Sequence, residues 1–407
     1  MNRLPFFYGW IMLPVVMVLL VCTSPGQTFG VAIFIPYIKD SLALTSGQLS
    51  GAYMAGTLFA SLPLIWVGIL MDRYGSRRVL FVVVILFGLT CISMNFVANL
   101  TSLFFVFFFL RLLGQGSLSM LARNALAMWF DRRLGFASGL SNIGMSLAVG
   151  AVPALGIALI NSYGWRSAYA ILGIGLCVVI LPLLIFVFKD SPDQVGENID
   201  GKTEGIDKEN IVKETDSLSM SEVLRTKSFW IINACIASWS MSGTATQFHI
   251  VDIFSGRGLG EIDVALMFSV FALVSAIGRI AGGILSDLLP QYVMVVLAMV
   301  LQGIGLSMLN LVVPSWLPFV FGVTSGLGSS LALAVSETVW VRYYGRKHLG
   351  KVRGTTYAIG VAASGIGPFF MGVGFDMMNS FTQVIWGCAI VSIILAVFGL
   401  FATPPRR

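Results

Sequence analysis

The chain has 407 residues, of which 57% are hydrophobic and 11% charged, whereas soluble globular proteins usually carry about 25% charged residues. This composition leaves almost no room for a water-soluble fold and indicates a protein that spans a membrane. The formal net charge of +6 would suit a nucleic-acid-binding protein. The basic residues, however, lie mainly in the loops between apolar segments, so no nucleic-acid partner is expected.

No pattern typical of catalysis or metal binding is visible. The two histidines, His249 and His348, are too far apart to form a zinc site without carboxylates, and no GxxxxGK[ST] loop for ATP occurs. A membrane-embedded enzyme would need clustered histidines, cysteines or paired carboxylates. We therefore expect neither an enzyme nor a bound metal or cofactor. The five cysteines stand singly in apolar segments, as expected for core residues: Cys22, Cys91, Cys177, Cys235 and Cys388.

Twelve apolar segments follow one another along the chain, and a helix of about 20 apolar residues crosses a membrane. The first segment is too long for the apolar region of a cleavable signal peptide and lacks a cleavage site, so we expect it to remain. The sequence predicts an all-α membrane protein with twelve transmembrane helices. The helices are expected at 8–38, 47–71, 79–98, 102–130, 134–161, 167–188, 229–256, 264–286, 292–312, 316–341, 354–379 and 382–402.

A charged segment separates the first six spans from the last six. Ten of the nineteen acidic residues fall within residues 190–222, and this stretch has no apolar periodicity, as expected for a solvated linker. Near its end, Ser219 and Ser221 precede Glu222, which favours a short capped helix. The expected organisation is an N-terminal half at 1–189, a linker at 190–228 and a C-terminal half at 229–407.

The distribution of basic residues predicts the orientation in the membrane. Nineteen of the 25 Lys and Arg residues lie on the side of the termini and the linker, and three lie on the other side. Because cytoplasmic loops are enriched in Lys and Arg, both termini and the linker are expected in the cytoplasm of a multi-pass protein of the bacterial inner membrane. The other three arginines, Arg111, Arg123 and Arg279, fall within the spans.

The two halves repeat a short motif at the end of corresponding spans. GILMD occupies residues 68–72 in the second span, and GILSD occupies residues 283–287 in the eighth. Two similar halves, related by an axis along the membrane normal, are typical of transporters that bind substrate at the interface of the halves near mid-membrane.

The longer stretch GILMDRYGSRR resembles the signature between the second and third helices of the major facilitator superfamily. The resemblance implies a fold of two six-helix halves and a gate-latch role, with no substrate contact, for Gly68, Asp72, Arg73, Gly75, Arg77 and Arg78. RLLGQG, which begins at Arg111, resembles the arginine-then-glycine pattern of the family's fourth helix. Arg111 could bind substrate, relay protons or serve helix packing.

Three further segments resemble the branch of monocarboxylate transporters and oxalate/formate antiporters: YGW at 8–10, WFDRRLGFASGLSNIG at 129–144 and SAIGRIAGGILSD at 275–287. This resemblance implies that Arg279 faces a central cavity and holds the substrate carboxylate. The depth of Arg279 in the membrane supports the same role. It lies eight residues before Asp287, which corresponds to roughly 12 Å into the membrane. The alternative is a structural ion pair of Arg279 with Glu337 or Asp252.

Small polar residues on other spans are candidates for lining the substrate site, although each could equally serve helix packing. They are Ser119, Asn142, Ser146, Ser330, Tyr357 and Ser364. The chain departs from the branch at Ser275, where proton-coupled relatives have an aspartate, and at Ser364, where oxalate carriers have a lysine. A single arginine suits one carboxylate better than two. Glu337, Asp252 and His249 are the candidates for proton coupling; the alternatives are an ion pair of Glu337 with Arg123 and a place at the membrane interface for His249 and Asp252.

The predicted function is secondary active transport of a small organic anion, with a monocarboxylate preferred, by alternating access around Arg279. Protons or a counter-anion would be the coupled species, and the protein is expected to work as a monomer in the lipid bilayer. A drug or cation exporter of the same superfamily is the alternative. Such an exporter would place an acid at mid-membrane, and Glu337 is the sole candidate for it. A transporter-derived sensor would need an output domain, and none is recognisable.

Overall fold

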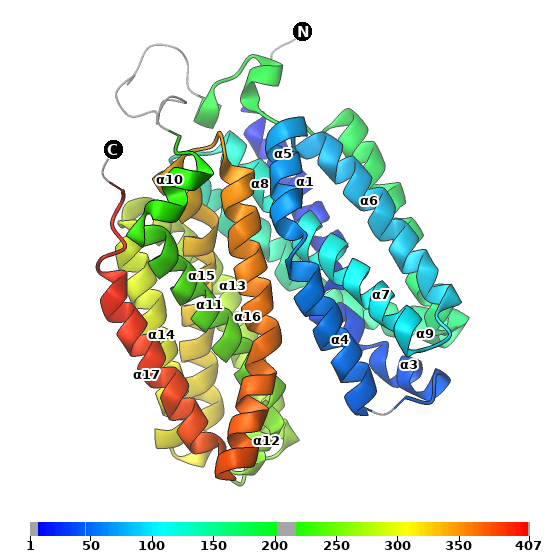
Figure 1. The fold of residues 1–407 in the computed structure, drawn as a ribbon, viewed down its shortest axis with the longest axis vertical. Coiled ribbons are helices and arrows are strands. Elements are labelled where there is room, and N and C mark those ends of the chain that lie inside the picture. The colour runs from blue at the N-terminus through cyan, green and yellow to red at the C-terminus, as the bar shows by residue number, and fades with distance from the viewer. Residues whose placement is uncertain (1–6, 45, 202–216, 406–407) are drawn as a thin grey trace. The chain divides into compact units, whose positions relative to one another are not determined.

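The computed structural model describes residues 7–44, 46–201 and 217–405, and these residues form helices and turns without any strand (Figure 1). In the first part of the chain the helices are α1 (Gly9–Cys22), η1 (Ser24–Gly26), α2 (Thr28–Ala32), α3 (Ile35–Ser41), α4 (Ser46–Ser61), α5 (Leu64–Tyr74), α6 (Ser76–Ser93), η2 (Met94–Phe96), α7 (Leu100–Leu110), η3 (Arg111–Leu118), α8 (Ser119–Trp129) and α9 (Leu134–Phe186). The later helices are η4 (Pro192–Val195), η5 (Ile199–Gly201), α10 (Met220–Arg225), α11 (Lys227–Phe248), α12 (Ile250–Ser255), α13 (Glu261–Leu288), α14 (Gln291–Leu311), η7 (Pro314–Trp316), α15 (Leu317–Tyr344), α16 (Leu349–Met378) and α17 (Phe381–Gly399).

The predicted all-α membrane architecture with twelve spans is confirmed. Within the described residues, ten helical segments are long and apolar enough to cross a membrane. The two other predicted spans correspond to α11, which has 22 residues and several polar side chains, and to the first part of α9. The break between the fifth and sixth spans lies at Gly164, where φ is 77° and ψ is 159°. This conformation suits glycine because it has no Cβ.

Two spans depart from regular α-helix. The first predicted span, 8–38, is interrupted after Cys22 by η1 and by the extended Gln27, whose ψ is 154°. Pro25 lies in this break and cannot donate a backbone hydrogen bond. We call residues 23–28 the helix-1 break. The fourth span contains the π-helical segment η3 between α7 and α8.

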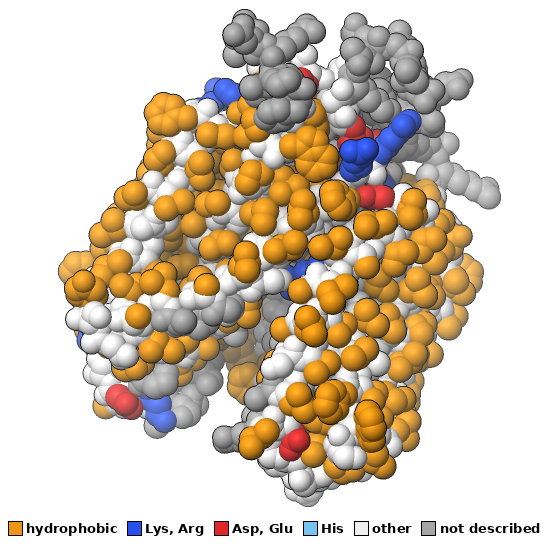
Figure 2. Space-filling view, turned by 180° about the vertical axis from the view of Figure 1, so that it is seen from behind, with side chains coloured by type: hydrophobic (Ala, Val, Ile, Leu, Met, Phe, Trp, Pro, Cys, Tyr) orange, Lys and Arg blue, Asp and Glu red, His pale blue; other side chains and the backbone are white. Residues whose placement is uncertain are grey.

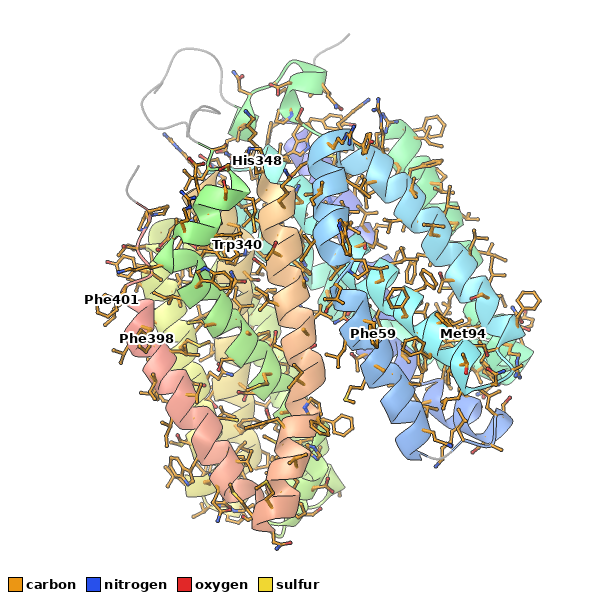
Figure 3. All side chains as sticks on the ribbon, in the orientation of Figure 1. Phe59, Met94, Trp340, His348, Phe398 and Phe401 are labelled. Atoms are coloured by element: carbon orange, nitrogen blue, oxygen red, sulfur yellow. The ribbon has the colours of Figure 1, made fainter. Side chains whose placement is uncertain are left out.

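The outward-facing side chains of both parts of the chain are mainly apolar, as expected for contact with lipid. Hydrophobic side chains cover most of the face seen in Figure 2, with few charged groups among them. Phe398 and Phe401, at the end of α17 and just beyond it (Figure 3), are 52% and 65% exposed, whereas Trp340 on α15 is buried. A hydrophobic exterior indicates that lipid replaces water as the surrounding medium.

Contacts between residues group the chain into two compact units. Unit 1 contains Met1–Arg132, Leu140–Thr215 and Arg346–Ala358, and unit 2 contains Arg133–Gly139, Asp216–Gly345 and Ile359–Arg407. The first residues of α16 therefore pack within unit 1, and the first residues of α9 pack within unit 2. Each unit thus contains the start of a helix whose remainder belongs to the other.

The predicted short helix at the end of the linker is confirmed as α10. Its N-terminus is capped because the backbone N–H of Ser219 donates to the Glu222 carboxylate at 2.7 Å. Residues 202–216 of the expected linker lie outside the described residues.

Candidate functional site

Arg111 is the first residue of the π-helical segment η3 and is only 4% exposed. It follows Leu100, the start of α7, by eleven residues, which corresponds to roughly 16 Å along the helix. In a hydrocarbon core about 30 Å thick, this depth is close to the middle. Because π-helical turns occur frequently at functional sites, Arg111 is the first residue to consider in unit 1.

The recorded partners of the Arg111 guanidinium are all neutral. Nε donates to the Thr57 hydroxyl at 3.1 Å, and Nη1 donates to the Gly26 carbonyl at 3.2 Å and to the Thr28 hydroxyl at 3.3 Å. The guanidinium carbon also lies 5.0 Å from the centre of the Tyr53 ring, in a cation–π contact. These contacts join α4 to the helix-1 break through one buried positive charge.

Ser119, a predicted site residue, belongs to the same region of unit 1. The Gln27 side-chain amide donates to the Ser119 hydroxyl at 3.3 Å and to the Thr23 hydroxyl at 3.1 Å. The structure therefore places Ser119 of α8 against the helix-1 break. Gln27 and Ser119 add neutral donors and acceptors to the surroundings of this break.

The other predicted residues of unit 1 lie on α9 and α16. Asn142 is 2% exposed, and the Ser146 hydroxyl donates to the Asn142 backbone carbonyl at 3.3 Å, one helical turn away. Tyr357, on α16, is half-buried. The Ser146 hydroxyl thus bonds within its own helix.

Arg279 of unit 2 lies on α13 and is half-buried. Its backbone carbonyl faces the start of α9 so closely that a Cβ atom at Gly139 would lie 2.5 Å from the carbonyl oxygen. Backbone packing of this kind requires glycine and fixes the position of the α13 turn that carries Arg279.

The serines of unit 2 form mainly helix-packing contacts. The Ser330 hydroxyl donates to the Gly326 carbonyl at 2.8 Å on its own helix and to the Ser275 carbonyl of α13 at 3.4 Å. The Ser275 and Ser329 hydroxyls lie 3.4 Å apart. On α16, the Ser364 hydroxyl donates to the Val361 carbonyl at 2.8 Å.

The three candidates for proton coupling have different surroundings. Glu337 on α15 is 3% exposed. His249 joins α11 to α12, and its Nδ1 lies 3.7 Å from Oδ2 of Asp252, whose side chain is 68% exposed. The other ring nitrogen of His249, Nε2, lies 3.1 Å from the Pro368 carbonyl oxygen. Glu337 is therefore the buried acid of the three.

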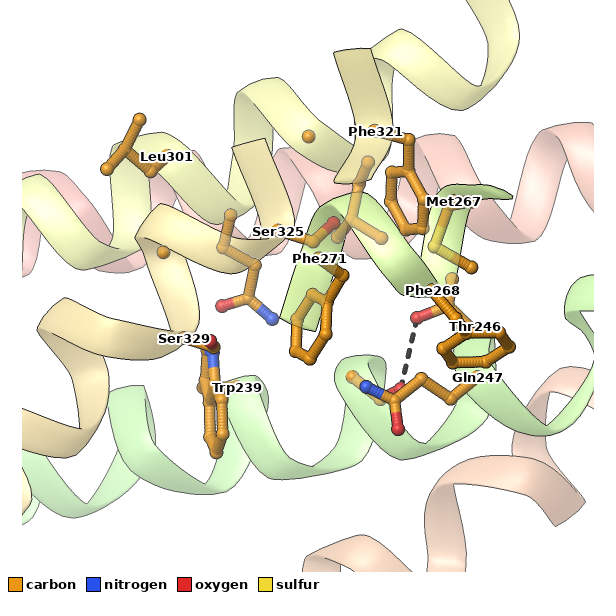
Figure 4. A pocket seen from close by; sticks show the side chains of 15 residues that line it. Trp239, Thr246, Gln247, Met267, Phe268, Phe271, Leu301, Phe321, Ser325 and Ser329 are labelled. Atoms are coloured by element: carbon orange, nitrogen blue, oxygen red, sulfur yellow. Dashed lines mark hydrogen bonds between the residues drawn. The ribbon is translucent and has the colours of Figure 1, made fainter. Parts of the chain in front are cut away.

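A separate pocket in unit 2 holds about 60 Å³ of water-accessible space among α11, α13, α14 and α15 (Figure 4). Trp239, Phe268 and Phe271 contribute aromatic walls, and the Thr246 hydroxyl donates to the Gly243 carbonyl at 3.3 Å. The lining contains no charged side chain. An unpaired ionic group of a ligand would find no counter-charge in this pocket.

The GILMD motif binds the beginning of α16 within unit 1. The Asp72 carboxylate accepts hydrogen bonds from the backbone N–H groups of Gly350 at 2.8 Å and of Lys351 at 2.9 Å. A Cβ atom at Gly68 would lie 2.1 Å from the Gly350 carbonyl oxygen. A carboxylate at a helix N-terminus is stabilised by the exposed N–H groups and the helix dipole. We call this contact the α5–α16 latch.

The basic residues of the same motif are attached differently. The backbone N–H of Arg77 donates to Asp190 at 2.7 Å, and its Nε donates to the Leu184 carbonyl at 2.6 Å. Gly75, at φ 84°, ends α5 in a conformation that glycine adopts readily. Arg73 lies over the Tyr74 ring, and Arg78 is exposed.

The GILSD motif makes the corresponding contact in unit 2. Asp287 accepts from the backbone N–H groups of Gly135 at 2.8 Å and of Phe136 at 2.9 Å, at the start of α9. A Cβ atom at Gly283 would lie 2.3 Å from the Gly135 carbonyl oxygen. Arg342 adds an ion pair with Asp287 at 2.5 Å. We call this contact the α13–α9 latch.

Sequence reasoning identified the two GILxD motifs and missed what they bind. The signal was present, because α9 begins LGFASG at 134–139 and α16 begins LGKVRG at 349–354. Each segment supplies the N–H groups for one aspartate and the glycines that allow close approach. Arg342, which pairs with Asp287, gave no such signal.

Comparison with known proteins agrees with this architecture. A probable sulfoacetate transporter of Cupriavidus necator is 26% identical over 40% of this chain and 38% of its own length. Monocarboxylate transporter 2 of Mesocricetus auratus is 24% identical over 63% of this chain and 55% of its own length. An oxalate:formate antiporter of Oxalobacter formigenes is 24% identical over 68% of this chain and 63% of its own. The chain thus matches about two fifths to two thirds of the length of these relatives.

A solved structure gives the same fold. The fucose:proton symporter FucP of E. coli is 14% identical, covers 98% of this chain and 100% of its own, and has a TM-score of 0.71. The sequence profile of the Major Facilitator Superfamily matches residues 17–291 and 240–407. The repeated latches, the helical fold and this match together establish that the chain belongs to the Major Facilitator Superfamily of transporters.

Proposed function

We propose that this transporter carries small organic anions, with a monocarboxylate as the preferred substrate. Arg279 carries the proposal, because it is the only ionisable side chain of α13 between Val264 and Ser286. Its planar guanidinium can donate two parallel hydrogen bonds to one carboxylate. The relatives named for sulfoacetate, monocarboxylates, oxalate and formate support an organic anion.

Neutral residues at two positions favour a single carboxylate. Ser275 lies one turn before Arg279, where an acid is expected in proton-coupled relatives, and Ser364 lies on α16, where a lysine is expected in oxalate carriers. Neither serine can titrate or supply a positive charge. The buried Glu337 is proposed to carry the coupled proton, with exchange for a second anion as the other mode of coupling.

We further propose that the two halves, residues 1–189 and 229–407, are joined by the linker at 190–228 and alternate in their access to the two sides of the membrane. Both termini and the linker would lie in the cytoplasm, since nineteen basic residues lie on that side and three on the other. We also propose that the protein lies in a bacterial inner membrane and works as a monomer.

Counterflow in proteoliposomes tests the substrate and Arg279 together. We expect uptake of labelled lactate, pyruvate or formate by the native protein, weaker uptake by Arg279→Lys and almost none by Arg279→Gln. Losing one charge-assisted interaction costs about 1.5–3 kcal/mol, or roughly ten- to a hundredfold in affinity. Arg257→Gln is the control, because it removes an arginine whose guanidinium binds the backbone carbonyls of Leu309 and Val312.

All variants must be compared at normal thermal stability. Native affinity for every carboxylate in Arg279→Gln would contradict the proposal. Counterflow of organic cations without any carboxylate would favour the exporter instead. If Arg279 is a structural partner of an acid, the variant should unfold more easily, and a second substitution at that acid should restore stability and transport together.

A further inference from the structure

The geometry points to an anion-binding group in unit 1: we propose that Arg111 binds the carboxylate or sulfonate of an organic anion through its Nη2 group. The inference rests on the proposed function for the class of ligand, and it does not depend on Arg279. It rests on the charges of unit 1, on the hydrogen bonds of the guanidinium and on the solvent access of the cluster formed by Arg111, Thr28, Tyr53 and Thr57.

Within its described residues, unit 1 supplies no free carboxylate to neutralise Arg111 at this depth. Residues 1–189 contain three acids, Asp40, Asp72 and Asp131, and the segment 346–358 contains none. Asp72 is engaged in the α5–α16 latch, and Asp131 pairs with Arg346 at 2.9 Å. Asp40 is exposed near the end of α3, outside the long spans. The remaining acids of unit 1, from residue 190 onward, follow the sixth span.

A guanidinium buried among neutral groups is incompletely stabilised. Hydrogen bonds to hydroxyls and carbonyls recover part of the lost hydration, but an ion removed from water without a counter-charge is costly. Within membrane spans, such groups usually face a ligand path or a paired acid. Since Asp72 in α5 is engaged by the α5–α16 latch and the other acids of unit 1 lie outside its spans, a ligand anion is the chemistry that completes the site.

The hydrogen-bond pattern leaves the Nη2 group of the guanidinium for a ligand. The recorded bonds use Nε and Nη1, while Nη2 makes none with the residues that the structure describes. Thr28 accepts from Nη1 at 3.3 Å and from the Tyr53 hydroxyl at 3.1 Å. Both of these bonds leave the Thr28 hydroxyl proton available. Nη2 and the Thr28 hydroxyl could therefore donate to two oxygens of one oxyanion.

The side of the cluster that carries these donors is accessible. Thr28 is exposed and Tyr53 is half-buried, whereas Arg111 and Thr57 are buried. An anion can therefore approach over Thr28 and Tyr53 without unfolding α4 or η3. The Tyr53 ring on this path carries no charge and therefore does not repel a carboxylate or a sulfonate.

The same contacts link anion binding to the helix-1 break. Arg111 holds the Gly26 carbonyl and the Thr28 hydroxyl, which lie at the end of the break. An anion on Nη2 and Thr28 draws the guanidinium away from these neutral acceptors, because charged acceptors form stronger bonds than neutral ones. Binding should therefore change hydrogen exchange in residues 26–31 as well as the overall stability.

Thermal unfolding of the purified full-length protein in detergent tests the site directly. Sodium formate, sodium lactate and sodium sulfoacetate are added separately, with sodium chloride at equal ionic strength as the salt control. We expect the organic anions to raise the Tm of the native protein and of the Arg257→Gln control. Arg111→Lys should weaken the apparent affinity, and Arg111→Gln should lower it roughly ten- to a hundredfold.

Thr57→Val tests the site without removing the charge. Valine deletes the acceptor of the Arg111 Nε–H at similar side-chain size, so the guanidinium loses a neutral partner. The Tm without anion should fall, and saturating lactate or sulfoacetate should restore more of it than in the native protein. A purely structural arginine predicts the same loss with and without anion, and that result would overturn the proposal.

The binding experiments distinguish the role proposed for Arg111 from the role proposed for Arg279. If Arg111→Gln of normal Tm keeps native affinity for all three anions, the proposal for Arg111 is wrong, whatever Arg279→Gln does. If Arg111→Gln loses the anion response while Arg279→Gln keeps it, the Arg111 site stands and the role proposed for Arg279 fails. Equal stabilisation by chloride and by the organic anions would overturn the organic-anion site.

Discussion

Replacing Gly68 with alanine should open the α5–α16 latch. A Cβ atom at this position would lie 2.1 Å from the Gly350 carbonyl oxygen, and ordinary contact begins at 3.4 Å. The two backbones must therefore separate by about 1.3 Å, because backbone atoms cannot rotate away as a side chain can. The change adds one methyl group and no charge.

The same movement breaks the hydrogen bonds of Asp72. Its contacts with the Gly350 and Lys351 N–H groups, at 2.8 and 2.9 Å, would lengthen to about 4 Å, beyond hydrogen-bonding distance. A hydrogen bond to a charged group contributes about 1.5–3 kcal/mol. Because the latch is partly accessible to water, we take the lower value for each bond and expect a loss of about 3 kcal/mol.

Hydrogen exchange of the α16 N-terminus measures these two bonds directly. A loss of about 3 kcal/mol corresponds to roughly a hundredfold faster exchange of the Gly350 and Lys351 amides. Gly175→Ala on α9 is the matched control, since a Cβ atom there meets nothing within 4 Å. Unchanged protection of both amides in Gly68→Ala, at normal Tm, would refute the reasoning.

Three further predictions concern the second latch, coupling and topology. Asp287→Asn should speed hydrogen exchange of the Gly135 backbone N–H at least tenfold, because the asparagine side chain lacks the negative charge that also pairs with Arg342. Exchange at the native rate would refute a stabilising latch. Glu337→Gln should slow anion movement driven by a pH gradient more than anion-for-anion exchange, as measured in proteoliposomes; equal loss of both would indicate a structural acid. A cysteine at Asn198 should resist an impermeant thiol reagent added outside intact cells, and ready labelling would reverse the proposed orientation.

The spans and their order could be predicted from the sequence because a membrane imposes a length on every helix. Segments such as 79–98 and 292–312 must be apolar for about 20 residues, and this requirement is local. The boundaries of α6 and α14 differ from the predicted ones by only a few residues. The Ser219 cap was predictable for the same reason, since Ser219 and Glu222 lie within one helical turn.

The breaks inside spans were harder to predict, because several conformations fit the same apolar sequence. The first span was predicted as one helix at 8–38, and the sequence did not show that the Gly26 carbonyl would accept from Arg111, 85 residues later. The π-helical segment likewise depends on how η3 packs against its neighbours. Arg111 was recognised as a candidate, and its neutral surroundings became visible only in the folded unit.

Partners far apart in the sequence were decided by the tertiary structure. The repeated GILMD and GILSD motifs could be recognised by eye, yet Asp72 binds an N-terminus that lies 278 residues later and Asp287 binds one 152 residues earlier. The hydropathy of a segment reflects the contact of that helix with lipid, whereas these hydrogen bonds depend on which helix ends are in contact with each other. A carboxylate can satisfy any exposed helix N-terminus, so only packing, through the glycines that let two backbones touch, selects the one that it binds.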